Sequence, residues 1–260
     1  MFDFKMFMFI HKATILRTLK HLFICFIIIH AVWSFCIKKI VYQHFFATPH
    51  QEELVISDDE LYIDLAPNSI RKMTVAGHPI KFKLLKQYQA TGRVIYVDRY
   101  TNPIGKHFRN SDQSDASLIY DEVAPQDITF VVGDLAKFPK LKGAHEYRIG
   151  KLDYEDEETY KIARRHPHLL DTHMTNIHTI AATSNIQRGL DILKAGDLAT
   201  LEGYLIYWEA TLPSGYIMEY KSAVFAGEKH TKLKFGGVSG LGLCKQLLLT
   251  KITFDGYTFE

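Results

Sequence analysis

Residues 198–207, LATLEGYLIY, indicate the fold more clearly than any other stretch of the chain. In a β-strand, Leu201, Leu205 and Tyr207 lie on one face, because side chains alternate between the two faces. Gly203 lies between them, and a glycine inside a strand marks a bend or a close approach of another backbone. Such a strand is typical of a small, strongly bent β-barrel.

The sequence on both sides of this strand extends the pattern. Ser184 followed by Gln187 forms a capping box, which predicts the start of a short helix. This helix is predicted over 184–193, and two further strands are predicted over 216–225 and 247–254. Residues 172–260 are therefore expected to form a C-terminal barrel module of the OB or SH3 kind.

The preceding part of the chain also has strand patterns. Alternating or β-branched runs predict strands at 61–65, 80–85, 92–97 and 128–132. We assign residues 60–150 to a β-rich domain and residues 151–171 to a charged helix or linker. The expected fold class is α+β, mainly β.

An apolar run from Leu22 to Ile37 stands out near the N-terminus. Residues 40–42 continue the apolar pattern, so a helix over 22–42 reaches the roughly 20 residues that a membrane span needs. No small-residue cleavage site follows the run, which favours an uncleaved signal-anchor over a cleaved signal peptide. The sequence thus predicts an N-terminal transmembrane helix that contacts the lipid bilayer.

Basic residues give the predicted span an orientation. Four Lys or Arg precede the apolar run 22–37 and two follow it, which places the N-terminus inside. Residues 1–21 are then cytoplasmic or interfacial, residues 43–59 form a spacer, and the C-terminal part is extracytoplasmic. The expected location is the inner (plasma) membrane, with a single pass and a periplasmic domain.

Charge and cysteine content limit the possible partners. Of the 31 Lys and Arg, six lie before Gln43, whereas only one of the 29 Asp and Glu lies there. The rest of the chain is therefore slightly acidic. Such a balance disfavours nucleic-acid binding. Cys244 is the only cysteine after the apolar run, so no disulfide is expected within the exported part, and stability must come from core burial.

Histidines supply the densest group of potential metal ligands. The candidate zinc ligands are His166, His168, His173 and His178, with Asp171 able to orient an imidazole. Their spacing matches no standard zinc motif, and a chain with 13 histidines produces clusters by chance. A metal-dependent hydrolase with zinc as its cofactor is kept as the alternative hypothesis.

Nucleophile motifs are incomplete. Ser239 lies in the glycine-rich stretch 236–242, but Leu241 stands where the hydrolase elbow needs its last glycine. A hairpin loop explains this stretch better. The sequence therefore favours a protein that is not an enzyme and that needs no cofactor.

Aromatic residues in the predicted barrel are candidates for ligand binding. OB-type barrels bind ligands on such faces by stacking, which nominates Tyr204 and Trp208 for a sugar or lipid head group. Asn176 and His178 complete the candidate ligand-binding set. Core packing explains the two aromatic residues equally well.

Several short motifs resemble those of a set of uncharacterised bacterial envelope proteins with one membrane helix and a β-rich exported part. The motifs are Asn176-Ile177-His178, Gly196-Asp197-Leu198, the stretch 201–205, the stretch 88–94 and Tyr100. The proline that we expect shortly after the Asn-x-His histidine is missing from residues 179–182. The resemblance implies an envelope location but no reaction, substrate or cofactor.

The sequence therefore predicts a membrane-anchored binding or scaffolding protein of the cell envelope. Its expected partner is another envelope protein or a cell-wall component.

Overall fold

The computed structural model is mainly β, with 47% of its residues in strands and 30% in helices. The chain folds as two units, Met1–Phe46 and Ala47–Glu260. The structure describes residues 4–33, 37–66, 69–75, 77–100, 115–141, 144–147, 151–154, 157–165, 173–212, 214–215, 217–222, 231–235, 238–242 and 244–260.

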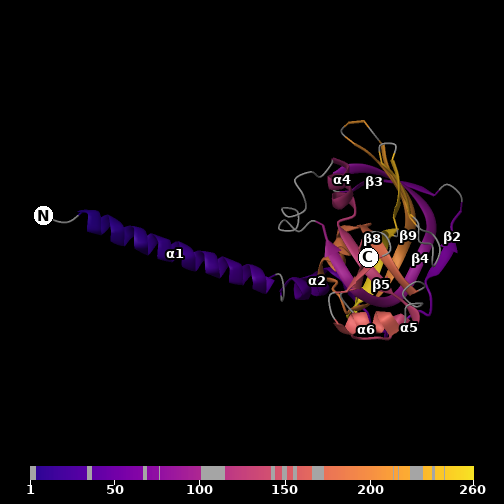
Figure 1. Cartoon of the computed structure of the whole chain (residues 1–260), viewed down its shortest axis with the longest axis horizontal. Helices are drawn as coiled ribbons and strands as arrows, with labels where there is room; N and C mark the ends of the chain where they lie inside the picture. Colours follow the sequence, from indigo (N-terminus) through magenta and orange to yellow (C-terminus); the bar gives the residue numbers. More distant parts are fainter. Residues whose placement is uncertain are drawn as a thin grey trace. The chain divides into compact units, whose positions relative to one another are not determined.

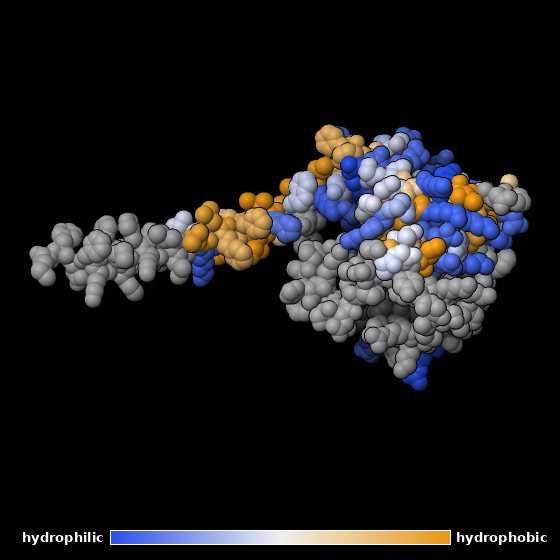
Figure 2. All heavy atoms as spheres, turned by 90° about the horizontal axis from the view of Figure 1, so that it is seen from above, coloured by the Kyte–Doolittle hydropathy of each residue, from blue (hydrophilic) through white to orange (hydrophobic). Residues whose placement is uncertain are grey.

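The N-terminal unit consists of helices α1 (Phe4–Val32) and α2 (Lys38–Phe46). Large apolar side chains, among them Phe23 and Ile29, are exposed on α1. Figure 2 shows apolar side chains, in orange, gathered along the helical segment.

The predicted transmembrane helix over 22–42 is wrong. In the part of the chain that the structure describes, no helix is both long enough and apolar enough to cross a membrane. Of the apolar run 22–37, α1 contains only residues 22–32, and α2 begins at Lys38 with two consecutive lysines, which lower its apolar character. The single-pass, signal-anchor and inner-membrane assignments, which rested on that span, are corrected with it.

Five strands of the second unit close into a ring. They are β4 (His78–Arg99), β5 (Gln126–Val131), β8 (Met174–Ala181), β13 (Cys244–Phe254) and β9 (Leu198–Thr211). Each pairs with the next in this order, and β9 pairs back with β4. The pair β8–β13 is parallel, and the other four pairs are antiparallel. Figure 1 shows β4, β5, β8 and β9 curving around a common centre.

The order of strands around this ring is characteristic. Numbered along the chain, the ring strands follow the order first, second, third, fifth, fourth, and helix α8 (Ser184–Ile192) connects the third to the fourth. A five-stranded Greek-key ring of this kind is the architecture of the OB-type barrel. The predicted fold class is wrong because it includes an N-terminal transmembrane helix, whereas its mainly β content is confirmed. The first two ring strands come from residues 78–131, so the ring is not confined to residues 172–260.

The remaining strands extend the ring into a 12-stranded sheet. These are β1 (Thr48–Pro49), β2 (Leu61–Asp64), β3 (Ile70–Val75), β10 (Ile217–Lys221), β11 (Thr231–Phe235), β12 (Val238–Gly242) and β14 (Tyr257–Phe259). A separate hairpin pairs β6 (Ala144–Tyr147) with β7 (Lys151–Tyr154). The other helices are α4 (Asp115–Val123), α5 (Gly133–Ala136) and α6 (Glu157–Arg165).

Bulges let β4 take part in both the ring and its extension. The register of β4 shifts at Leu84/Lys86 against β9, and at Val94/Tyr96 against β5. A bulge bends a strand and increases its twist. The strand therefore pairs with β3 near one end and with β5 near the other.

Gly203 is the predicted position of close backbone approach. A Cβ built on it would lie 2.2 Å from the carbonyl oxygen of Leu248 on β13. The interpretation of this glycine from the sequence is confirmed, because only a residue without a side chain lets β9 and β13 pair here.

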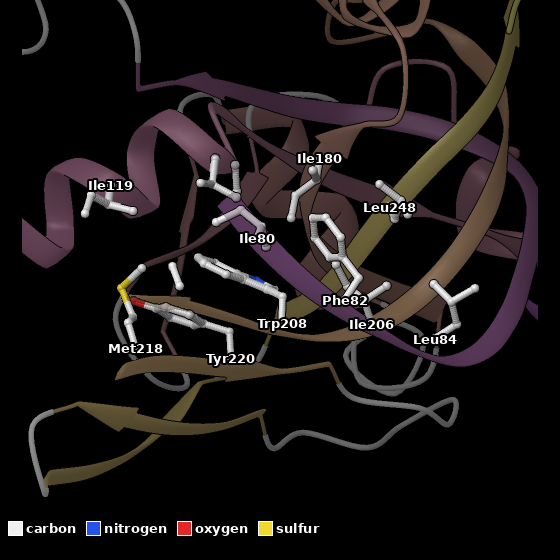
Figure 3. Close-up of a cluster of buried hydrophobic side chains, with 13 residues drawn as sticks. Ile80, Phe82, Leu84, Ile119, Ile180, Ile206, Trp208, Met218, Tyr220 and Leu248 are labelled. Atoms are coloured by element: carbon white, nitrogen blue, oxygen red, sulfur yellow. The ribbon is translucent and has the colours of Figure 1, made fainter. Parts of the chain in front are cut away.

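A buried apolar cluster lies where α4 covers the sheet. It joins Ile119 of α4 to Trp208 and Tyr220 of β9 and β10, and to Ile180 and Leu248 of the ring. Figure 3 shows the rings of Trp208 and Tyr220 close together, with Ile119 near them. This cluster forms the apolar floor of the site described next.

Candidate functional site

Three polar side chains lie side by side across neighbouring ring strands. His178 of β8 pairs with Asp127 of β5 on one side and with Gln246 of β13 on the other. Paired residues project from the same face of a sheet. The pairing of the strands thus builds a polar row from residues that are far apart in the sequence.

Asp127 is the centre of this row. Its carboxylate contacts Nδ1 of His178 through one oxygen. The other oxygen accepts hydrogen bonds from the hydroxyl of Tyr100 and, at 3.3 Å, from Nδ2 of Asn176. The side chains of His178 and Asp127 are 13% and 12% exposed, so the pair lies at the edge of the core rather than deep inside it.

Aromatic rings border the polar row. Tyr120 of α4 meets His178 edge to face at 5.2 Å between ring centroids, and stacks on Trp208 at 5.9 Å. Tyr220 stacks on Trp208 from β10 at 4.7 Å. Aromatic pairs at these separations contribute about 0.5–1.5 kcal/mol beyond their buried area.

Gln246 connects the polar row to the rings. Its Oε1 accepts a hydrogen bond from Nε1 of Trp208 at 3.2 Å, and its Nε2 donates to the hydroxyl of Tyr120 at 3.1 Å. The backbone N–H of Gln246 donates to the hydroxyl of Ser222. One amide thus fixes the orientation of an indole and a phenol together.

The site combines one carboxylate, that of Asp127, with an imidazole, amides and phenols. Burial, and then the negative charge of Asp121, raise the pKa of the Tyr220 hydroxyl above its ordinary value, so this phenol stays neutral at pH 7. An imidazole oriented by a carboxylate is able to accept or donate a proton, or to bind a polar ligand.

The structure brings together three of the four residues predicted to bind a ligand. Asn176 and His178 lie on one face of β8, and Tyr120 connects His178 to Trp208. The ring of Trp208 is fully buried under Tyr120 and Tyr220. Tyr204 packs against the same buried cluster as Tyr120, and the guanidinium of Arg71 lies 5.4 Å from its ring centroid.

The sequence interpretation missed Asp127, Tyr120 and Gln246. Asp127 lies near the start of β5, Tyr120 lies in α4, and Gln246 lies near the start of β13. None of them belongs to a recognisable sequence motif. The registers of β5 and β13 with β8 bring Asp127 and Gln246 to His178, and the packing of α4 brings Tyr120 there. No local signal was available to find them.

The structure describes only two of the four predicted zinc ligands, His173 and His178. His166 and His168 lie outside the residues that the structure describes, as does Asp171. The backbone carbonyl of His173 accepts a hydrogen bond from Val132. Among the described side chains, no group of three or more His, Cys, Asp or Glu is placed to hold a metal ion. The zinc hypothesis stays a prediction.

Comparison of the chain with protein-family models, with curated proteins and with solved structures yields no match.

Proposed function

We propose that the Ala47–Glu260 unit is a binding module and that its ligand is a neutral glycan, bound at the edge of the Asp127–His178 row. The proposal keeps the binding role expected from the sequence and gives it a site. The observation that carries it is the place of this row within the ring.

The row lies on the second and third strands of the ring, β5 and β8. Tyr120 comes from the connection between the first and second strands, and Tyr220 from the connection between the fourth and fifth. In OB-type barrels this face and these two connections bind oligonucleotides and oligosaccharides. The chemistry of the residues at this position decides which of these ligands fits.

The chemistry of the site favours a sugar over a nucleic acid. Asp127 supplies a carboxylate and His178 an imidazole, which match hydroxyl groups as acceptor and donor. The carboxylate repels phosphate groups, whereas nucleic-acid sites need a surplus of positive charge. Tyr120 offers an aromatic ring beside these polar groups. Ligand sites commonly combine aromatic side chains with a few polar groups, and a sugar has both an apolar face and hydroxyl groups to match them.

Preorganisation supports a binding role. The side chains that would meet the ligand already orient one another through Asp127 and Gln246. Groups that are held in place lose little conformational entropy when a ligand binds. A binding site is therefore a better explanation for the partly exposed Asp127–His178 pair than packing alone.

Indole NMR signals provide the test. The chain has two tryptophans, so the spectrum of the 15N-labelled protein holds two indole N–H signals, and a Trp33→Phe variant identifies that of Trp208. We expect a saturable shift of the Trp208 signal when a neutral sugar from a panel of N-acetylglucosamine, glucose, galactose and mannose oligosaccharides is added.

Variants locate the binding. His178→Ala should weaken the affinity for the sugar at least about tenfold, because the loss of a hydrogen bond to a charged group costs about 1.5–3 kcal/mol. Tyr207→Phe is the matched control, because Tyr207 is the neighbour of Trp208 on the opposite face of β9. A panel that leaves the Trp208 signal unmoved, or binding that His178→Ala leaves intact, would refute the glycan site.

A further inference from the structure

A second buried polar cluster lies on the other face of β13. Lys245 precedes Gln246, so its side chain projects away from the Asp127–His178 row. Its ammonium donates to both oxygens of the Glu60 carboxylate, at 2.9 and 2.7 Å. The side chains of Lys245 and Glu60 are each only 5% exposed.

The groups around Glu60 match the shape of a carboxylate. One oxygen accepts a hydrogen bond from the hydroxyl of Tyr88 at 2.8 Å, and the other accepts one from the hydroxyl of Tyr62. Lys245 bridges the two oxygens and also donates to Thr175 at 2.9 Å. Each oxygen thus receives one phenol and a share of one ammonium, which is the symmetry of a planar carboxylate and not of a tetrahedral phosphate.

Aromatic rings complete the enclosure. The ammonium of Lys245 lies 5.7 Å from the ring centroid of Tyr62 and 6.0 Å from that of Tyr88. Both distances are within the range of a cation–π interaction. Lys245, Tyr62, Tyr88 and Thr175 therefore form a built receptor for one carboxylate, which we call the Lys245 cage.

The occupant of the Lys245 cage comes from a segment without helix or strand. Residues 50–60, called here the strap, join β1 to β2 and have no regular secondary structure. The strap is fixed at His50, whose N–H donates to Gly256, and at Ser57, which exchanges hydrogen bonds with Thr91. Between these points Val55 is 79% exposed. A strap held at separate points is able to detach locally.

The stability of the fold does not require an ion pair at this position. Burying two charges costs several kcal/mol per ion, and well-packed apolar residues of similar volume often replace a buried pair without loss. Three donors on one carboxylate, with Thr175 holding the ammonium from behind, are thus more elaborate than packing demands.

We infer that the Lys245 cage is a carboxylate-binding site and that Glu60 occupies it as a tethered ligand, which a carboxylate-bearing ligand replaces when the strap detaches. The strap then acts as a built-in competitor. The inference is independent of the glycan site, because the two sites use opposite faces of β13 and β8 and share no residue.

The full-length Glu60→Ala variant tests whether the cage binds a free carboxylate. Acetate is the probe, and sodium chloride at equal ionic strength is the reference. We expect acetate to raise the melting temperature of this variant by about 3 °C at ten times its dissociation constant, with saturation. Glu60→Gln is the matched control, since its amide fills the cage and leaves no room for acetate.

The double variant Glu60→Ala/Lys245→Met shows whether the effect belongs to the cage. Acetate should stabilise the single variant and leave the double variant at its chloride value. Equal melting temperatures of the single variant in acetate and in chloride, or an equal rise in the double variant, would overturn the inference.

Hydrogen exchange of the wild-type chain gives a second readout, which holds even if Glu60→Ala fails to fold. The amides of Ser57 and Thr91 both donate within the strap contact. Molar acetate should speed their exchange severalfold relative to molar chloride, because it competes with Glu60. Unchanged exchange of these two amides would show that the strap is a fixed structural element and would refute its role as a competitor.

Discussion

Asp127 and His178 lie directly opposite each other in the antiparallel pair of β5 and β8, and the carboxylate of the first contacts Nδ1 of the second. The same carboxylate also accepts hydrogen bonds from Tyr100 and Asn176. One acidic side chain therefore orients three neighbours, which makes it the residue on which the candidate glycan site most depends.

Replacement of Asp127 should cost stability as well as binding. Asp127→Ala leaves three polar groups without their shared acceptor, so we expect the free energy of unfolding to fall by about 3 kcal/mol. Urea denaturation measures this change. Asp134→Ala is the control, because the side chain of Asp134 is 71% exposed and its surface ion pair with Lys137 contributes little. Equal effects of the two variants would contradict the central position of Asp127.

Arg99 should hold the end of helix α8 in place. Its guanidinium donates to the backbone carbonyls of Leu190, Asp191 and Leu193, which the helix end leaves without intrahelical partners. Burial lowers the pKa of this guanidinium, and the nearby charge of Asp191 partly offsets the effect, so the group stays charged at pH 7.

Arg99→Met should therefore lower the free energy of unfolding by about 2 kcal/mol and speed amide exchange in the last turn of α8. Arg188, on the same helix, donates to the side chains of Ser184 and Asn185 near the surface, so Arg188→Ala should change stability by less than about 1 kcal/mol. Unaltered exchange near Leu193 in the Arg99 variant would argue against this cap.

Tyr88 should make stability fall at alkaline pH. Burial, and then the charge of Glu60, raise the pKa of its hydroxyl well above the ordinary value of 10.0. The folded state then keeps this proton where the unfolded state releases it. The contribution of Tyr88 to the free energy of unfolding is complete below about pH 10. It declines as the pH rises above about 10, by up to about 1.4 kcal/mol per pH unit for one proton.

Tyr88→Phe removes this titration together with the hydrogen bond to Glu60. The variant should be less stable than the wild type at pH 8, by about 1 kcal/mol, and the difference should shrink between pH 10 and 11.5. Urea denaturation across this pH range measures both values. Two curves that stay parallel above pH 10 would show that the folded-state pKa is not raised.

Gly203 should tolerate no side chain. A Cβ would lie 2.2 Å from the carbonyl oxygen of Leu248, and both backbones belong to the closed ring. Gly203→Ala should destabilise the protein by more than about 3 kcal/mol, as overpacking of a rigid core does. Gly77→Ala is the comparison: its φ of +87° disfavours alanine, but no atom lies within 4 Å, so we expect a cost of about 1 kcal/mol. A smaller loss for Gly203→Ala than for Gly77→Ala would contradict the close approach of β9 and β13.

Local patterns in the sequence identified many of the elements. The strands expected at 61–65, 128–132 and 198–207 correspond to β2, β5 and β9, and the helix expected at 184–193 corresponds to α8. The N-cap of α8 differs by one residue, since the hydroxyl of Thr183, not Ser184, accepts the hydrogen bond from Ile186. Alternation and capping are local properties, so a single sequence reveals them.

The candidate site could be predicted only in part. Asn176-x-His178 lies within one strand and was found, whereas Asp127 lies 49 positions before Asn176 and was not. Similarly, nothing near Glu60 in the sequence points to Lys245, which is 185 positions away. Partners across a sheet are set by register, which a hydrophobic pattern restricts but does not specify for a chain with this many strands.

The sequence by itself determined the alternation of strands, the helix α8 and the need for a glycine at position 203, because backbone preferences and side-chain periodicity act over a few residues. The tertiary structure alone decided that β4 and β5 close the ring with β8, β13 and β9. It also decided that α1 ends at Val32, inside the predicted span 22–42. Ring closure depends on bulges and on pairings between distant strands, whose free energy comes from burying both faces at once, and no local stretch of sequence encodes that sum.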